Sequence, residues 1–434
     1  MSSRPLESLL LALFLLGLPG SAAAQAAPVK TAPTAPLRKT PPTPTQAPPT
    51  PAKARAGELG IPFGGQSGPL GAITDVLGVE VGHATVLSGQ GRLVVGRGPV
   101  RTGVTVVWPR GKAETAPVFA ATHVLNGNGE MTGTHWVNES GLLYGPTLLT
   151  TTTSVGTVRD AMIAWAVKRE RSFELSLPVV AETYDGLLND IDGFHVRQEH
   201  VFKALDGASR GPVAEGSVGG GTGMLCHGFK GGIGTASRKL PEAQGGYTIG
   251  VLVQCNYGKR RHFTVAGVPV GEEITDLQAC TTGDRPPSNA LITNMPACTK
   301  QGASLPSFPE GMGSIIVVVA TDAPLLPHQL ERMARRVPLG IGKMGGLGED
   351  GSGDLFLAFS TQPTLPATPG PVATVSTLDN ERMNPLFEAT VQATQEAILN
   401  AMLAADMMTG ADGIRIFALP HDRLMEAMRK YGRK

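Results

Sequence analysis

Four short runs of β-branched and large apolar residues recur along the chain, each flanked by glycine or proline. Runs of this kind predict β-strands. They cover residues 104–108, 247–254, 314–320 and 355–359. Because several of them are continuously apolar rather than alternating, we expect both faces of these strands to be covered.

Helical patterns lie between these runs. Residues 157–170 place apolar side chains along one side and follow Ser154, a candidate N-cap. The pair Asn384-Pro385 predicts a helix start, and the apolar stripe after it predicts a helix that stops at Gly410. A shorter amphipathic helix is expected over residues 421–431. Strands and helices interleave without a strict βαβ rhythm, so we predict a layered α/β sandwich with sheets inside and helices outside.

The N-terminus differs in composition from the rest of the chain. Arg4, the apolar run 9–18 and the small residues 22–24 have the layout of a signal peptide over residues 1–24. A stray apolar N-terminus is the alternative. The run is too short to span a bilayer, so we expect a periplasmic or secreted protein without a membrane anchor. Residues 25–57 are rich in Pro, Thr and Ala and predict a disordered tether, with the folded unit starting near Leu59.

Charge balance and cysteine spacing argue against two classes of function, nucleic-acid binding and zinc binding. The chain has 36 acidic and 37 basic residues, so no global field favours nucleic acid as a partner. Its four cysteines include no CxxC pair, which argues against a zinc site. Cys280 and Cys298 share a Pro-, Thr- and Gly-rich region and are candidates for a disulfide, the alternative being unpaired buried thiols.

The common catalytic templates are missing from the sequence. There is no HExxH motif and the nine histidines are scattered, so we predict neither a metal nor a cofactor. Neither Ser314 nor Ser352 stands in a GxSxG motif. The run Gly219–Gly223 lacks the spacing of a P-loop or a dinucleotide-binding turn.

A glycine-rich turn delivers Ser314 directly onto the start of a predicted buried strand. Gly313 has no side chain to obstruct an attack by the Ser314 hydroxyl on the preceding carbonyl. Cleavage there would place a free α-amine, with a pKa of about 7.7–8.0, on the same residue as the hydroxyl, where it can act as a base. Taken alone, the pattern is also that of an ordinary loop-to-strand junction.

Several runs together resemble the family of L-aminopeptidases with D-esterase/D-amidase activity, which includes the β-peptidyl aminopeptidases. They stand in the family's order and cover essentially the whole folded region. The runs are Gly71–His83, Ala181–Gly186, Gly221–Met224, Phe229–Arg238, Val251–Gly258, Gly313–Pro324 and Gly351–Asp354.

The resemblance implies a four-layer αββα sandwich like that of the N-terminal-nucleophile hydrolases, made as a precursor and cut between Gly313 and Ser314. Residues 58–313 would form the α-chain part of the catalytic domain, and residues 314–434 the β-chain part. Several such αβ units would assemble into a homo-oligomer.

The resemblance also implies roles for single residues. Ser314 is the nucleophile, and Asn256 and Tyr184 stabilise the oxyanion. A side-chain amide at a strand end can donate to developing negative charge, although an ordinary turn residue or a packed tyrosine has the same local sequence.

Three acidic or hydroxyl side chains complete this set. Ser352 and Asp354 support the nucleophile. Because they are two residues apart at a strand entrance, we expect their side chains to share a face and form a relay toward Ser314. The alternative is an ordinary polar turn. Glu182 meets the free amine of the substrate, whereas most glutamates are simply solvated. Position 354 is Asp where some members carry Glu, and the segment 259–312 is longer than the family usually has.

We therefore predict an exported aminopeptidase/amidase that removes N-terminal residues from small peptides, amides or esters through an acyl-enzyme on Ser314. Two alternatives remain. One is an acyltransferase of the ornithine acetyltransferase type, which uses Thr at the cut site. The other is a non-catalytic exported binding protein with the same fold.

Overall fold

The computed structural model describes residues 53–171, 177–289, 292, 295–299, 312–362 and 371–433. The chain divides after Pro51, and the fold described below is that of Ala52–Lys434. The predicted signal peptide and most of the predicted tether lie outside the described residues.

One sheet has four strands, antiparallel except for the last pair. Their order is β1 (Glu80–Ser88), β2 (Val100–Trp108), β5 (Thr147–Thr151) and β6 (Val179–Thr183). A second sheet has six strands, of which only the central pair β12–β13 is parallel. Their order is β4 (Leu142–Leu143), β3 (Val118–Gly127), β13 (Gly351–Ser360), β12 (Met312–Thr321), β10 (Thr248–Asn256) and β9 (Gly232–Lys239).

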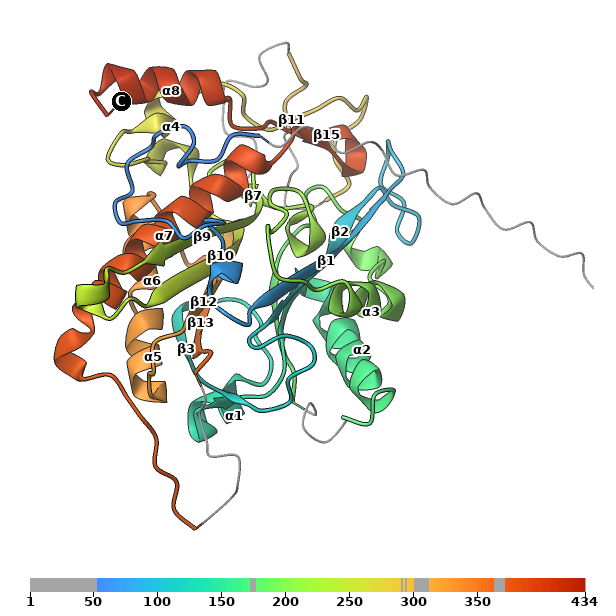
Figure 1. Ribbon diagram of the computed structural model, residues 1–434. Helices are drawn as coiled ribbons and strands as arrows, with labels where there is room; N and C mark the ends of the chain where they lie inside the picture. The colour runs from blue at the N-terminus through green and yellow to red at the C-terminus, as the bar shows by residue number, and fades with distance from the viewer. Residues whose placement is uncertain are drawn as a thin grey trace, which may run out of the picture. The chain divides into compact units, whose positions relative to one another are not determined.

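Helices cover the outer face of each sheet, and the two inner faces pack on each other (Figure 1). Helices α2 (Val155–Val167) and α3 (Gln198–Asp206) pack on the four-stranded sheet. Helices α5 (Pro327–Ala334), α6 (Val337–Lys343) and α7 (Asn384–Ala404) pack on the six-stranded sheet. The predicted four-layer αββα sandwich is confirmed.

The position of β12 between the two layers explains why its sequence is continuously apolar. Along β12, Ile316 and Val318 face the four-stranded sheet, while Ile315 and Val317 face the helices. Both faces are buried, so successive residues are all apolar. The four predicted strands lie in β2, β10, β12 and β13.

Smaller elements complete the unit. They are α1 (Thr134–Ser140), α4 (Val270–Glu273), α8 (His421–Lys430), β7 (Leu225–Cys226), β8 (Phe229–Lys230), β11 (Cys280–Thr281), β14 (Met408–Thr409) and β15 (Ile414–Ile416). No helix in the described ranges combines the length and apolar character needed to cross a membrane.

Helix ends differ from the predicted ones. Ser154 precedes α2 but makes no side-chain cap bond, and Asn384 is the first residue of α7 rather than its cap. Helix α7 ends at Ala404, before the predicted stop at Gly410, because Ala405 adopts an extended conformation. The Ala405 carbonyl accepts a hydrogen bond from the distant Lys53 at 2.7 Å, so a tertiary contact lies at this end.

The first described residues, assigned above to the tether, contact the folded unit. Arg55 donates to Glu215 at 2.8 Å, and Ala56 is completely buried. The folded part therefore begins before Leu59. Two disulfides are formed. One joins Cys280 to Cys298, as one of the two sequence interpretations had it; the other joins Cys226 to Cys255, a pair that was not predicted.

Candidate active site

Ser314 lies at the start of β12, in the centre of the six-stranded sheet. It stands directly opposite Asn256, the last residue of β10, and beside Gly353 of β13. Its Oγ accepts a hydrogen bond from the Gly353 N–H at 3.1 Å. Gly313 has φ = +146°, and a Cβ there would lie 2.4 Å from the Asn256 carbonyl oxygen, so glycine is required before Ser314.

A cavity of about 210 Å³ opens at Ser314, where the ends of the two sheets meet. Five residues predicted for the site line it: Glu182, Tyr184, Asn256, Gly313 and Ser314. Glu182 lies in β6 and Tyr184 follows that strand, so the four-stranded sheet supplies one wall and the six-stranded sheet the other. Leu187, Leu225 and Ile292 make part of the lining apolar.

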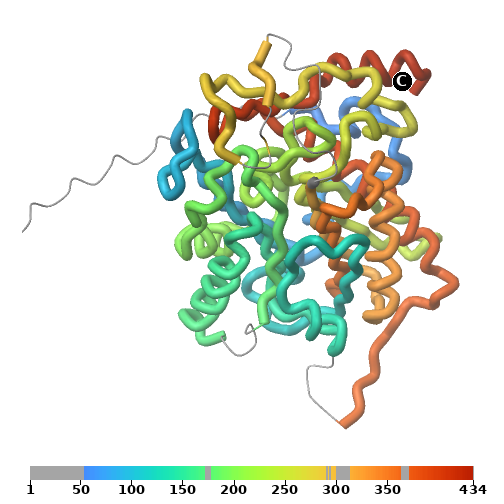
Figure 2. Tube along the Cα trace, turned by 180° about the vertical axis from the view of Figure 1, so that it is seen from behind, coloured from blue at the N-terminus to red at the C-terminus, as the bar shows by residue number. Residues whose placement is uncertain are grey.

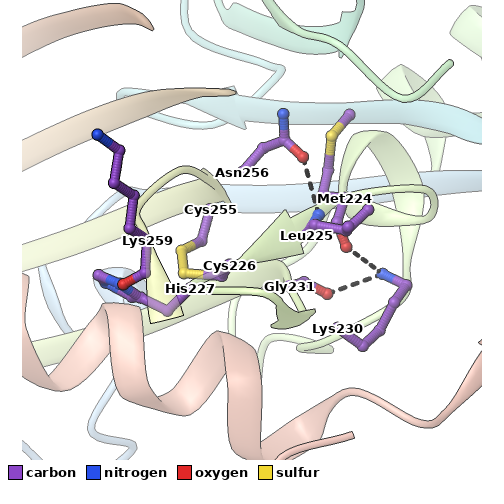
Figure 3. Close-up of a disulfide and its surroundings, with 9 residues drawn as sticks. All are labelled: Met224, Leu225, Cys226, His227, Lys230, Gly231, Cys255, Asn256 and Lys259. Atoms are coloured by element: carbon purple, nitrogen blue, oxygen red, sulfur yellow. Dashed lines mark hydrogen bonds between the residues drawn. A yellow bond between two sulfur atoms is a disulfide. The ribbon is translucent and has the colours of Figure 1, made fainter. Parts of the chain in front are cut away.

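The Asn256 amide is held in one orientation (Figure 3). Its Oδ1 accepts the Leu225 N–H at 2.8 Å, and its Nδ2 donates to the Tyr184 carbonyl at 3.1 Å. The first partner is only a donor and the second only an acceptor, so the amide cannot be flipped. The second Nδ2 hydrogen can therefore be donated into the cavity.

Two further features hold the hairpin of β7 and β8 that supplies the Leu225 N–H. The buried disulfide between Cys226 and Cys255 ties β7 to β10 next to Asn256. The fully buried Lys230 donates to the Met224 carbonyl at 2.8 Å and to the Gly231 carbonyl at 2.9 Å, and burial lowers the pKa of Lys230 to about 7. Figure 3 shows both contacts beneath Leu225.

Glu182 is a buried carboxylate that is hydrogen-bonded but not ion-paired. Its Oε1 accepts the Glu130 N–H at 3.0 Å, and its Oε2 accepts the Thr152 hydroxyl. Within the described part of the chain, no lysine, arginine or histidine forms a salt bridge with it. Burial raises the pKa of Glu182, and the two hydrogen bonds only partly oppose this. Binding of a cation beside this carboxyl would favour its ionised form.

Ser352 and Asp354 share a face, as predicted, but it is not the face of the Ser314 side chain. In the parallel register Ser314 lies beside Gly353, and side chains alternate along each strand, so Ser352 and Asp354 point toward the helix layer. The Ser352 hydroxyl donates to Asp354 Oδ1 at 2.5 Å, and the carboxylate also accepts the Ile315 N–H. Burial raises the pKa of Asp354 to about 6. Their relay to Ser314 stays a prediction.

Other groups of the site gave little signal in the sequence. The N–H groups of Leu225 and Gly353 belong to the backbone, so no residue type marks them. Thr152 lies in a threonine run directly after β5, and that position was the one available signal. In the described ranges no group of three or more His, Cys, Asp or Glu is arranged to hold a metal ion.

A family model covers this region of the chain. The model of peptidase family S58 matches residues 71–416, which include every site residue described above. The chain is also 50% identical over 380 residues to the β-peptidyl aminopeptidase BapA of Sphingosinicella microcystinivorans, covering 87% of this chain and 93% of that protein.

Two solved structures share the architecture. A β-aminopeptidase from Burkholderia sp. is 45% identical with a TM-score of 0.74, covering 87% of this chain and 99% of that one. The L-aminopeptidase D-Ala-esterase/amidase of Ochrobactrum anthropi, described as a prototype of the serine aminopeptidases and a variant of the N-terminal-nucleophile hydrolase fold, is 43% identical with a TM-score of 0.75 and the same coverage.

Proposed function

Because the chain belongs to peptidase family S58 and is a serine-type N-terminal-nucleophile aminopeptidase, we propose that it cuts itself before Ser314 and then hydrolyses substrates with a free N-terminal amine. One observation carries this proposal. The Ser314 hydroxyl and the Glu182 carboxylate, which has no ion-pair partner in the described structure, line the same cavity.

Self-cleavage follows from the position of Ser314. Its Oγ attacks the Gly313 carbonyl carbon and loses its proton. The Gly313–Ser314 C–N bond then breaks as the proton passes to the Ser314 nitrogen, and an ester replaces the amide. Water then hydrolyses the ester, which leaves a Gly313 carboxylate and a free Ser314 amine. Gly313 carries no side chain that could shield its own carbonyl from this attack.

In turnover, the freed amine takes the proton of the Ser314 hydroxyl as the oxygen attacks the substrate carbonyl. The negative charge on that carbonyl oxygen is stabilised by the Asn256 Nδ2–H and the Tyr184 hydroxyl. The leaving group departs with a proton and leaves an acyl-enzyme, which water resolves. Glu182 binds the substrate ammonium by a charge-assisted hydrogen bond.

Ser352 and Asp354 are proposed to support the new amine rather than the hydroxyl. The Asp354 carboxylate already accepts the N–H of Ile315, the residue after Ser314. Once the Gly313–Ser314 bond is cut, the Ser314 nitrogen is no longer fixed by the preceding residue. It can then turn toward this carboxylate.

The substrate class is that of short peptides, amides or esters, and the names of the relatives add β-peptides as candidates. Nothing in the comparisons favours the acyltransferase or the inert binding protein. We also propose export, supported by the N-terminal sequence pattern, and assembly of several αβ units. N-terminal sequencing from the native host should find a start near Gln25, and retention of Met1 on a cytoplasmic protein would contradict export.

The aminopeptidase proposal is tested by a paired assay. An aminoacyl-p-nitroanilide and its N-acetyl derivative differ only in the charge that Glu182 is proposed to bind. We expect hydrolysis of the first substrate and none of the second. Equal rates on both would overturn the proposal and favour a general amidase.

Processing is tested on a denaturing gel of the purified protein. We expect two fragments, the second running from Ser314 to Lys434, which is 434 − 314 + 1 = 121 residues. A single uncut chain with full activity would contradict the N-terminal-nucleophile mechanism.

A further inference from the structure

The segment that joins β10 to β12 contains a loop closed by the disulfide between Cys280 and Cys298, here called the 280–298 loop. Its described residues are 280–289, 292 and 295–298. Strand β11 pairs this loop with β15, and the Cys298 N–H donates to the Thr281 carbonyl at 2.9 Å. Figures 1 and 2 show the yellow trace of this loop beside β15. The loop is thus anchored at both ends.

Two residues of the 280–298 loop reach the active-site cavity. Ile292 is almost completely buried and lines the cavity. The Asn289 Nδ2 lies 3.1 Å from the Tyr184 hydroxyl oxygen and 3.2 Å from the Gly186 carbonyl oxygen. None of the roles described so far uses Asn289.

The Gly186 contact settles the direction of the Tyr184 contact. A backbone carbonyl can only accept, so the end of the Asn289 side chain near Gly186 must be its NH₂ group. The same nitrogen therefore donates to the Tyr184 oxygen. The Tyr184 proton is then not used toward Asn289 and remains available for the cavity that Tyr184 lines.

The Tyr184 ring is fixed from another side as well. A Cβ on Gly186 would lie 2.4 Å from both Cζ and Oη of Tyr184, so the ring packs directly on the glycine backbone. With the ring fixed, the remaining freedom is rotation of the hydroxyl hydrogen, and Asn289 restricts that rotation. A phenol that accepts one hydrogen bond is also a better donor of the next.

We propose that Asn289 is a positioning residue that directs the Tyr184 hydroxyl proton toward the substrate carbonyl oxygen, so that the 280–298 loop completes the oxyanion side of the site. This inference rests on the proposed function, because it requires Tyr184 to stabilise the oxyanion.

The test is a double-mutant cycle with Asn289→Leu, which keeps the side-chain volume and removes the donor, and Tyr184→Phe. Each variant is first shown on a gel to be cut, and rates on an aminoacyl-p-nitroanilide are normalised to the cut fraction. Asp284→Asn, at an exposed position of the same loop, is the matched control and should keep wild-type kinetics.

We expect Tyr184→Phe to lower kcat by about a hundredfold, as for loss of one oxyanion donor. Asn289→Leu should lower kcat by about tenfold with little change in KM, as for loss of one neutral hydrogen bond that acts in the transition state. In the Tyr184→Phe background, Asn289→Leu should change kcat by less than about twofold, because the group it positions is gone.

Two other outcomes separate this inference from the proposed function. Asn289→Leu could lower kcat by the same factor in both backgrounds, or leave kcat unchanged in both. Either result would mean that Asn289 does not act through Tyr184, and the inference would be overturned while the proposed function stands. If Tyr184→Phe leaves kcat unchanged, the oxyanion role of Tyr184 fails, and the inference fails with it.

Discussion

Two buried carboxylates, one on each side of the six-stranded sheet, are treated in opposite ways. On the helix side, Glu396 of α7 lies 2.6 Å from the Arg238 guanidinium of β9, and both side chains are buried. On the cavity side, Glu182 receives hydrogen bonds from the Glu130 N–H and Thr152, and no cation of the described ranges pairs with it. The first charge is neutralised within the fold, and the second is the one proposed to bind the substrate ammonium.

The presence or absence of a paired cation separates a structural carboxylate from a candidate functional one in this fold. Removing one partner of a buried ion pair strands the other charge, so the Arg238–Glu396 pair should matter for folding. A buried carboxylate without a cation gives no such pair energy, and burial raises the pKa of Glu182. A substrate ammonium would supply the positive charge that pairs with this carboxylate. The comparison predicts loss of stability on one side and loss of activity on the other.

The largest effect is expected at Ser314, the group that Glu182 is proposed to serve. Ser314→Ala removes the hydroxyl that attacks both Gly313 and the substrate, so we expect one uncut chain and no turnover. The change removes a single oxygen and should leave the folded state intact, as judged by circular dichroism. Cleavage of this variant at the same bond would mean that a separate protease makes the cut.

The next effect is on stability, at Glu396. Glu396→Leu leaves Arg238 buried without its counter-charge and should lower the free energy of unfolding by about 3–5 kcal/mol. A denaturant titration measures this, with the exposed Glu388→Gln of the same helix as the control. The kinetic constants of the protein that remains folded should equal those of wild type. A large loss of kcat with unchanged stability would mean that Glu396 acts in the reaction and not in the stability of the fold.

At Glu182 the expected effect is on activity. Glu182→Gln should lower kcat/KM for a free-amine substrate by about a hundredfold, because a neutral amide cannot replace the charge-assisted bond to ammonium. Self-cleavage, which involves no free amine, should persist.

The same variant should not lose stability. A pKa raised on folding means that the folded chain holds a proton that the unfolded chain has lost, so the stability of wild type falls as the pH rises above the ordinary glutamate range. Glu182→Gln lacks this contribution and should melt at or above the wild-type temperature at pH 8. An undiminished preference for the free amine over its N-acetyl derivative would move the amine site to another residue.

The sequence predicted the central strands well, because burial on both faces leaves a continuous apolar run that no surface helix shares. Helix ends were predicted less well. The predicted stop of α7 at Gly410 was wrong because the helix ends where Ala405 meets Lys53, a residue far away in the sequence. Local propensity carries no information about such a contact.

The candidate site divides in the same way. Ser314, Asn256, Tyr184 and Glu182 stood in recognisable motifs, and the structure brings them to one cavity. The sheet register was not predictable from local sequence, and it places Ser352 and Asp354 on the face opposite to the Ser314 side chain. Asn289 was missed because a single Asn in a long loop is normally a turn residue.

The smallest expected effect is on pH dependence, and it comes from Asp354. Burial raises the pKa of this carboxyl to about 6, and its proposed support of the Ser314 amine requires the ionised form. About one tenth of the groups are ionised at pH 5, so kcat at saturating substrate should show a second acidic limb with a midpoint near pH 6. The loss at pH 5 should be about tenfold beyond the loss caused by protonation of the Ser314 amine. Because the pKa is raised on folding, stability should instead fall as the pH rises from about 4 to about 6.

Asp354→Asn tests whether the pH dependence of kcat and that of stability both come from this carboxyl. The variant cannot ionise at position 354, so its kcat should be low and should lack the second limb, falling from pH 7 to pH 5 only as the Ser314 amine is protonated. Its melting temperature should lose the component that declines between pH 4 and pH 6. Asp354→Glu keeps a carboxyl on a longer stem. It should therefore retain the second acidic limb, although its midpoint can shift. If a midpoint near pH 6 persists in Asp354→Asn, another group controls the rate. Asp354 would then resemble Glu396 as a structural carboxylate, and Glu182 would be left as the acidic residue of the reaction.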